Sequence, residues 1–199
     1  MTRSLLLALA LMLAAPLASA QLATGAAPPM ADQPLAAADG STLSLAQAAG
    51  PSGLVVMFWS NACPWTDRYA PRLASLVERY APAGIGFVLV NPNDPTANQH
   101  ETVAASREAA AKAGLAVPYL ADPTGAVAAA FGATNAPHVY FFDGSGALRY
   151  DGALDDSPAS ANRVRVPYLA QAMDQSIAGL PVEVQRTQAF GCSIKRAGE

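Results

Sequence analysis

The residues with the clearest potential for chemistry are the two cysteines of the chain, Cys63 and Cys192. Cys63 follows an apolar run from Leu54 to Trp59 and precedes Pro64, which fits the first turn of a helix because its missing N–H costs nothing there. A thiol in that turn meets unpaired backbone N–H groups and the positive end of the helix dipole, and both favour the thiolate. Since the thiolate is the reactive form, Cys63 is predicted to be a reactive cysteine.

Two charged neighbours leave the sign of the pKa shift of Cys63 open. Asp67 opposes thiolate formation if it faces the sulfur, whereas Arg68 assists it. An inert, buried Cys63 is therefore the alternative interpretation of the same position.

The N-terminus indicates export. Arg3 precedes an apolar run from Leu5 to Ala18, which is shorter than the roughly 20 residues that span a bilayer. Ala18-Ser19-Ala20 has the small-x-small pattern that a signal peptidase accepts, so we expect a cleaved signal peptide over residues 1–20, with an uncleaved anchor as the alternative. The expected location is the periplasm or the outside of the cell, where a disulfide can persist.

Composition excludes several classes of protein. With 199 residues, 52% hydrophobic and 14% charged, the chain suits one folded domain rather than a disordered chain. A net charge of −3 offers no basic surface for nucleic acid. No second long apolar run follows the first, so we expect no stable membrane insertion. Cys63, Cys192 and His138 include no close-spaced ligand pair, and we therefore expect no metal and no cofactor.

Hydropathy and turn residues predict one α/β domain, with a central mixed sheet and helices on both faces. Two strand–helix units predict parallel strands, and a hairpin adds an antiparallel edge. Asn98 and Glu101 have the spacing of a capping box at the start of a helix. The expected elements are strands over 54–59 and 85–90, helices over 69–80, 98–113, 123–131 and 167–180, and a hairpin over 139–150. We expect a flexible linker over 21–38, the domain over 39–182 and a C-terminal tail over 183–199 that carries Cys192.

Several short segments carry a family resemblance: Asn91-Pro92-Asn93-Asp94, Ala136-Pro137, Tyr150 to Asp156, and Gly191-Cys192-Ser193-Ile194-Lys195. With a cysteine at the first strand–helix junction, they resemble the thioredoxin fold. More narrowly, the chain is similar to secreted thioredoxin-like or redoxin-domain proteins, whose site reads Cys-x-x-Cys-Pro-aromatic. The resemblance covers about residues 39 to 196. It implies a cis peptide bond before Pro137, which would face the site where a substrate peptide can pair.

The chain departs from that pattern at Ser60, which stands where the family has its first cysteine. A thiol–disulfide oxidoreductase needs a second thiol to resolve its mixed disulfide, so resolution falls to Cys192 or to another protein. The resemblance then implies a thiol–disulfide redox protein, with Cys63 as the reactive cysteine and Cys192 as its resolving partner. Pro137 and Trp65 are the expected substrate-binding residues.

Two other functions remain open. The Ser60-x-x-Cys63 spacing also resembles the Thr/Ser-x-x-Cys of peroxiredoxins, in which the hydroxyl polarises a peroxide and the cysteine becomes a sulfenic acid. The upstream proline and the arginine expected of that family are missing, which counts against this function. A binding module that uses its cysteines only as a structural disulfide is the third hypothesis. The expected partners are accordingly protein thiols or disulfides, or a small peroxide, together with an external electron donor.

We predict a disulfide between Cys63 and Cys192. Twelve residue steps separate Leu180 from Cys192, and at ~3.3–3.6 Å each they can cross a small domain. The sequence leaves open whether this disulfide is catalytic or structural.

Overall fold

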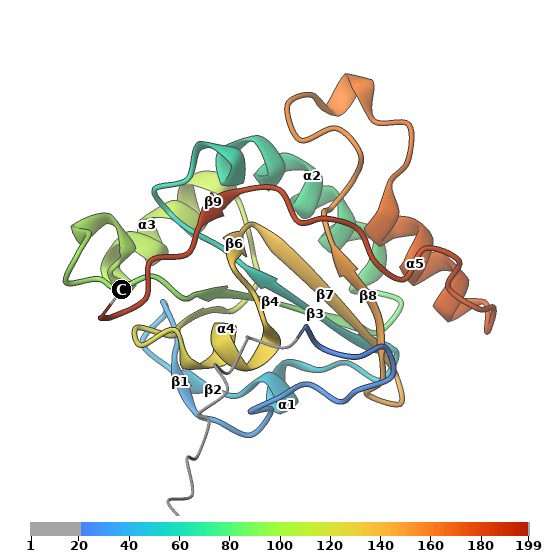
Figure 1. Ribbon diagram of the computed structural model, residues 1–199, viewed down its shortest axis with the longest axis horizontal. Helices are drawn as coiled ribbons and strands as arrows, with labels where there is room; N and C mark the ends of the chain where they lie inside the picture. The colour runs from blue at the N-terminus through green and yellow to red at the C-terminus, as the bar shows by residue number, and fades with distance from the viewer. Residues whose placement is uncertain (1–20, 199) are drawn as a thin grey trace, which may run out of the picture.

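The computed structural model describes residues 21–198 (Figure 1). The expected signal peptide over residues 1–20 lies outside the described residues. Within 21–198, no helix is both long enough and apolar enough to cross a membrane.

A mixed sheet of five strands forms the centre of the molecule (Figure 1). β3 is the middle strand of this sheet, and all six of its residues are buried, as its continuous apolar sequence predicts. β3 pairs antiparallel with β7, which pairs antiparallel with β8, while β4 pairs parallel with β5. The strands follow the order β5 (Tyr119–Ala121), β4 (Ile85–Asn91), β3 (Gly53–Phe58), β7 (His138–Asp143) and β8 (Leu148–Gly152).

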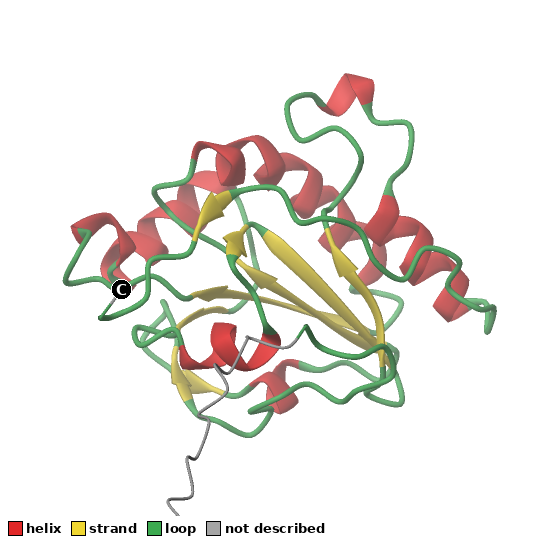
Figure 2. Cartoon of the chain, viewed as in Figure 1, coloured by secondary structure: helices red, strands yellow, loops and turns green. Residues whose placement is uncertain are grey.

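Helices cover both faces of this sheet (Figure 2). Alternate residues of β3 serve two separate cores: Val55 and Met57 pack in one, and Leu54, Val56 and Phe58 pack in the other. The first core takes α2 (Pro64–Tyr80), α3 (Val103–Ala113) and α5 (Tyr168–Ile177), and the second takes α1 (Leu45–Ala48) and α4 (Ala126–Phe131). The predicted thioredoxin-like α/β architecture is therefore confirmed.

Short elements complete the chain around the sheet. One small antiparallel pair lies near the N-terminus, and a second joins the C-terminal segment to the loop before β7. These elements are β1 (Leu35–Ala36), β2 (Thr42–Leu43), β6 (Asn135–Ala136), β9 (Cys192–Ser193) and the 3₁₀ helices η1 (Gln99–Glu101) and η2 (Ala161–Arg163).

The segment 21–38 differs from the flexible linker expected from its composition. Its backbone is tied to the sheet, since Gly25 N–H donates to Leu148 O and Leu148 N–H donates to Ala26 O. Leu35 and Ala37 are buried in the second core. The alanine-rich, weakly charged composition that suggested a flexible linker also allows the segment to be buried against the fold, because little polar surface is then removed from water.

The expected capping box of Asn98 and Glu101 is also corrected. Asn98 caps the short helix η1, because its side chain accepts from His100 N–H. α3 begins later, at Val103, with Thr102 as its N-cap. The carboxylate of Glu101 is consequently not a helix cap, and it turns into the protein toward the residues that precede Cys63.

Candidate functional site

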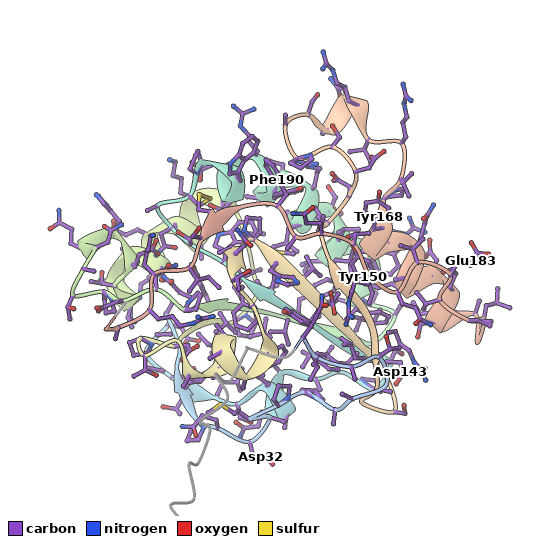
Figure 3. All side chains as sticks on the ribbon, in the orientation of Figure 1. Asp32, Asp143, Tyr150, Tyr168, Glu183 and Phe190 are labelled. Atoms are coloured by element: carbon purple, nitrogen blue, oxygen red, sulfur yellow. A yellow bond between two sulfur atoms is a disulfide. The ribbon has the colours of Figure 1, made fainter. Side chains whose placement is uncertain are left out.

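The structure contains the predicted disulfide between Cys63 and Cys192. Figure 3 shows the sulfur–sulfur bond in yellow, close to Phe190. The two Cα atoms are 5.9 Å apart, although the cysteines are 129 positions apart in sequence. Cys63 has extended dihedrals and is the N-cap of α2, with Pro64 as the first helical residue. The sequence therefore placed Cys63 correctly, at the junction of a buried strand and a helix.

The peptide bond between Ala136 and Pro137 is cis, as the resemblance implied. The residues just before it form β6, which pairs antiparallel with β9: Ala136 lies opposite Cys192, and Asn135 lies opposite Ser193. Cys192 therefore occupies the backbone edge beside the cis-proline. In a thioredoxin-like fold this edge faces the reactive cysteine.

We call residues 183–196 the C-terminal strap, since they run across the ends of several strands (Figure 1). Before Cys192, the strap is held on β8, where Asp151 N–H donates to Gln185 O and Thr187 N–H donates to Asp151 O. After Cys192, Ile194 is buried, and its N–H donates to Thr134 O. Cys192 is thus positioned by backbone contacts on both sides of it, besides its bond to Cys63.

Gly191 shows how closely the strap approaches the cis-proline loop. A Cβ atom at Gly191 would lie 2.2 Å from Ala136 O, a separation that real Cβ atoms do not show. Only glycine permits the strap to reach this edge, because any larger residue meets backbone rather than a movable side chain.

Glu101 is the principal site residue that the sequence analysis missed. It is 6% exposed, and its carboxylate accepts four hydrogen bonds from neutral donors. The donors are Ser60 Oγ at 2.5 Å, Asn61 N–H at 2.9 Å, Ala62 N–H at 3.3 Å and Asn91 Nδ2 at 2.8 Å. Glu101 therefore fixes the turn that leads from β3 into Cys63, and it engages the hydroxyl of Ser60.

A second buried carboxylate, Asp151, lies under the strap. Its Oδ2 accepts from Arg186 Nε at 2.9 Å and from Arg186 Nη2 at 2.6 Å. His138 Nε2 lies 4.0 Å from Asp151 Oδ1. Burial raises the pKa of Asp151, but His138 and Arg186 lower it, and the net result is a lowered pKa. Arg186 belongs to the strap, so this ion pair helps to hold the segment that carries Cys192.

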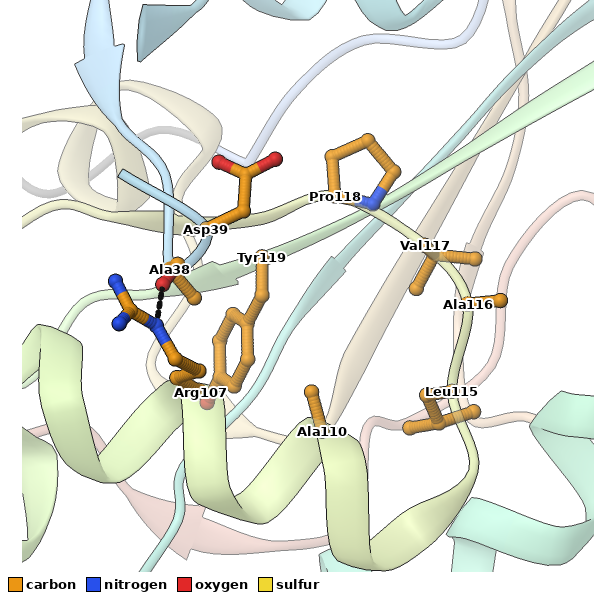
Figure 4. A pocket seen from close by; sticks show the side chains of 9 residues that line it. All are labelled: Ala38, Asp39, Arg107, Ala110, Leu115, Ala116, Val117, Pro118 and Tyr119. Carbon is orange, nitrogen blue, oxygen red and sulfur yellow. Dashed lines mark hydrogen bonds between the residues drawn. The ribbon is translucent and has the colours of Figure 1, made fainter. Parts of the chain in front are cut away.

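A hollow of about 180 Å³ reaches the disulfide. Its walls include both cysteines, Ser60, Glu101, Asn93 and Lys195. A larger hollow of about 640 Å³ lies between α3 and residues 115–119, and Figure 4 shows that Arg107 donates to the Ala38 carbonyl at its edge. That larger hollow contains neither cysteine, so the small one is the candidate site for chemistry at sulfur.

Trp65 is the second residue of α2 and contacts the strap. Its ring centroid is 4.7 Å from that of Phe190, in an edge-to-face arrangement. Phe190 is 44% exposed, although it is large and apolar. The two rings therefore form a partly exposed apolar surface next to Cys63 and Cys192.

The predicted site residues thus lie in one region: Ser60, Cys63 and Trp65 at the start of α2, and Cys192 and Pro137 at the β6–β9 edge. Glu101 was missed because its sequence spacing matched a helix cap. One signal could have located it. Glu101 follows β4, Ser60 follows β3, and the carboxyl ends of neighbouring parallel strands meet at one edge of a sheet, so the two residues could be expected close together.

A protein-family model supports this assignment of the fold. The model described as the AhpC/TSA family matches residues 25–151, a range that includes Cys63 and Pro137 and ends before Cys192. Among curated proteins, none matches the chain.

Two solved structures resemble the chain over nearly its whole length. An uncharacterized conserved protein from Geobacillus kaustophilus is 31% identical, with a TM-score of 0.80, and the match covers 89% of this chain and 94% of that one. A hypothetical protein from Sinorhizobium meliloti 1021 is 29% identical, with a TM-score of 0.82, and the match covers 90% of this chain and 98% of that one.

A third structure, more distant, shows the fold alone. It is a secreted Mycobacterium tuberculosis disulfide oxidoreductase homologous to E. coli DsbE, 18% identical to this chain. The match has a TM-score of 0.53 and covers 74% of this chain and 95% of that one.

Proposed function

The chain belongs to the AhpC/TSA family, and from this premise we propose that it is an exported thiol–disulfide redox protein whose couple is Cys63 and Cys192. The observation that carries the proposal is the position of Cys192. The strap brings this residue to the cis-proline edge, where it bonds to Cys63 and supplies the second thiol that Ser60 cannot supply.

The fixed strap favours a redox couple. Because backbone contacts hold Cys192 on both sides, reduction leaves its thiol close to that of Cys63, and oxidation needs no large movement. The hollow beside the disulfide gives a partner thiol a route to the sulfurs. Thiol–disulfide exchange requires these two conditions, a nearby resolving thiol and access to a sulfur.

The arrangement of Ser60 does not favour a peroxidase. Its hydroxyl donates to Glu101 at 2.5 Å, so its proton is engaged and is not directed toward a peroxide at Cys63. Reaction with a peroxide is therefore an outcome that the test below must separate from disulfide exchange.

We propose that the partner is a protein with a thiol or disulfide in an extended, apolar segment. Trp65 and Phe190 offer apolar contact beside the disulfide. The strap already pairs with the backbone edge of residues 135–136, so a partner reaches the sulfurs through the hollow beside these rings. An external electron donor completes the cycle.

The central test is a redox titration of the purified protein against glutathione buffers. Reversible reduction of the Cys63–Cys192 disulfide under native conditions is expected, together with reduction of a small disulfide by the reduced protein. Cys63→Ser and Cys192→Ser should each abolish turnover, whereas Ser193→Ala, an exposed neighbour, should retain it. A disulfide that resists glutathione in the folded protein indicates a structural bridge, and faster oxidation by hydrogen peroxide than by disulfides indicates a peroxidase.

Export has its own test. N-terminal sequencing of the protein recovered from its compartment is expected to begin at Gln21, which follows the Ala18-Ser19-Ala20 pattern. A full-length protein retained in the membrane would contradict this part of the proposal.

A further inference from the structure

The two sulfurs of the disulfide differ in their access to solvent. Cys63 is 2% exposed, because it lies between the buried strand β3 and the start of α2. Cys192 is partly exposed, because it belongs to the strap, in a short strand laid over β6. A partner that approaches from solvent therefore meets Cys192 before it meets Cys63.

The geometry of exchange increases this difference. A thiolate attacks one sulfur of a disulfide in line with the S–S bond, from the side opposite the sulfur that leaves. Attack on Cys63 would bring the partner in from the side facing away from the strap, where Cys63 is packed into the protein. Attack on Cys192 can come from the strap side, where the neighbouring Ser193 is exposed and lines the hollow together with Cys192.

The leaving sulfur also favours this direction. Exchange is faster when the departing thiolate is the more stable one. Cys63 is the N-cap of the 17-residue helix α2, where the positive end of the helix dipole favours negative charge. Cys192 lies in a two-residue strand and has no such position.

We propose that partners exchange at Cys192, and that Cys63 is the sulfur that leaves and later resolves. This inference rests on the proposed redox function, and it reverses the order expected from the sequence, in which Cys63 attacks first. Cys192 then takes the role of the accessible first cysteine of Cys-x-x-Cys, whose sequence position is occupied by Ser60 here. Cys63 takes the role of the second, buried cysteine.

The reaction balances as a two-step exchange. The thiolate of a low-molecular-weight or protein thiol bonds to Sγ of Cys192, the bond from Cys192 to Cys63 breaks, and its electron pair remains on Cys63 as thiolate. A second partner thiolate then attacks the partner sulfur of the mixed disulfide, which releases Cys192 as thiolate and forms the partner disulfide. Two partner thiols are oxidised, and the Cys63–Cys192 disulfide is reduced. In the opposite direction, Cys192 attacks a partner disulfide and Cys63 resolves the mixed disulfide.

The test uses the oxidised wild-type protein and reduced glutathione. The reaction is quenched at increasing times with N-ethylmaleimide, which captures the departing thiolate, and peptides are mapped without reductant. Early products are expected to carry glutathione on Cys192 and the maleimide on Cys63, in about tenfold or greater excess over the opposite pair. The same oxidised protein, unfolded in denaturant, is the control, and there the excess should fall to near parity because the folded packing is gone.

The outcomes separate the inference from the function on which it rests. Glutathione chiefly on Cys63, or equally on both cysteines of the folded protein, overturns the inference and leaves the redox function standing. An excess at Cys192 that persists in the unfolded protein also overturns it, because the preference would then not come from the fold. A folded protein that forms no mixed disulfide, while its unfolded form does, contradicts the proposed function itself and the inference with it.

Discussion

Glu101 and Asp151 are both buried carboxylates, and each holds one side of the disulfide, but they do so with different partners. Glu101 accepts from neutral groups, among them the backbone N–H groups of Asn61 and Ala62, just before Cys63. Asp151 accepts from the guanidinium of Arg186, six residues before Cys192. One carboxylate therefore binds the turn of Cys63, and the other binds the strap of Cys192.

The two carboxylates hold parts of the chain that depend on the core to different degrees. The turn held by Glu101 joins β3 to α2, so it belongs to the sheet and its first core. The strap joins the fold later in the chain, through pairing with β6, backbone contacts to β8 and an ion pair. We therefore expect changes near Glu101 to affect the stability of the whole domain, and changes in the strap to affect chiefly the pairing of Cys192 with Cys63.

The largest expected effect is that of Glu101→Ala. This change removes the acceptor of the buried Ser60 hydroxyl and of the part-buried Asn61 and Ala62 N–H groups, and it takes one of the acceptors of the buried Asn91 amide. Each unsatisfied buried donor costs about 1–3 kcal/mol, so we expect the free energy of unfolding to fall by about 3 kcal/mol or more. Denaturant titration of the oxidised protein measures it.

Glu108→Ala is the matched control for that change, since Glu108 is an exposed acid on α3. It should change the free energy of unfolding by less than about 0.5 kcal/mol. If Glu101→Ala is equally mild, the carboxylate does not hold the Cys63 turn and the comparison with Asp151 fails.

Gly191→Ala should act on the other side of the disulfide. Its new Cβ meets Ala136 O, a backbone atom, so the strap must move away from the cis-proline edge. Overpacking of this kind costs about 1–3 kcal/mol, and we expect about a tenfold to hundredfold shift of the glutathione equilibrium toward the reduced protein. Ser193→Ala is the control, and an unchanged equilibrium in Gly191→Ala would show that the close approach is not needed for the disulfide.

Local patterns in the sequence predicted the Cys63 half of the site and the fold around it. The buried run of β3, Pro64 after Cys63, and Pro137 before a hairpin all have local signatures, and the structure contains each of them. The role of Glu101 has no local signature, because three of its four donors lie about 40 residues earlier in the chain. Its spacing from Asn98 instead matched a capping box, which is a contact within a few residues.

The strap and the N-terminal segment were harder to predict for the same reason. Residues 21–38 and 183–196 have little periodicity of their own and gain their order from contacts with distant strands. The three-residue strand β5 is short enough to escape a hydropathy pattern, although it completes one edge of the sheet. Tertiary contacts, rather than propensity, determine these elements.

Arg186→Met should make the stability of the fold more sensitive to acid, because it removes the ion pair that holds the strap on Asp151. The net lowering of the Asp151 pKa means that this carboxylate stabilises the fold above its unfolded pKa, near 3.9, and that this stability is lost as pH falls through the lowered folded value. Removing the guanidinium shrinks this contribution, so the acid-unfolding midpoint should move to higher pH. Because Arg186 is partly exposed, the loss at pH 7 should be about 1–2 kcal/mol.

Arg79→Met is the control for the acid experiment, since Arg79 forms an exposed pair with Asp174. Such a pair contributes about 0–1 kcal/mol, so its acid-unfolding midpoint should barely move. An equal shift in both variants would mean that the Asp151 pair behaves as a surface pair and does not anchor the strap.

The smallest expected effect, that of Ser60→Ala, decides what the hydroxyl of Ser60 does. This hydroxyl donates to Glu101, whose carboxylate keeps its three other donors after the change, so we expect a loss of only about 1 kcal/mol in the free energy of unfolding. The rate at which glutathione opens the disulfide should remain within about twofold, because the hydroxyl supports the turn and takes no part in exchange at Cys192. Stopped-flow reduction and denaturant titration measure the two quantities on the same sample. If the hydroxyl instead activates a peroxide, Ser60→Ala would leave the free energy of unfolding nearly unchanged and would abolish the oxidation of reduced Cys63 by hydrogen peroxide. That result would make Ser60 a participant in the reaction rather than a support for the turn before Cys63. The contrast between a structural Glu101 side and an Asp151 side that holds the strap would then fail.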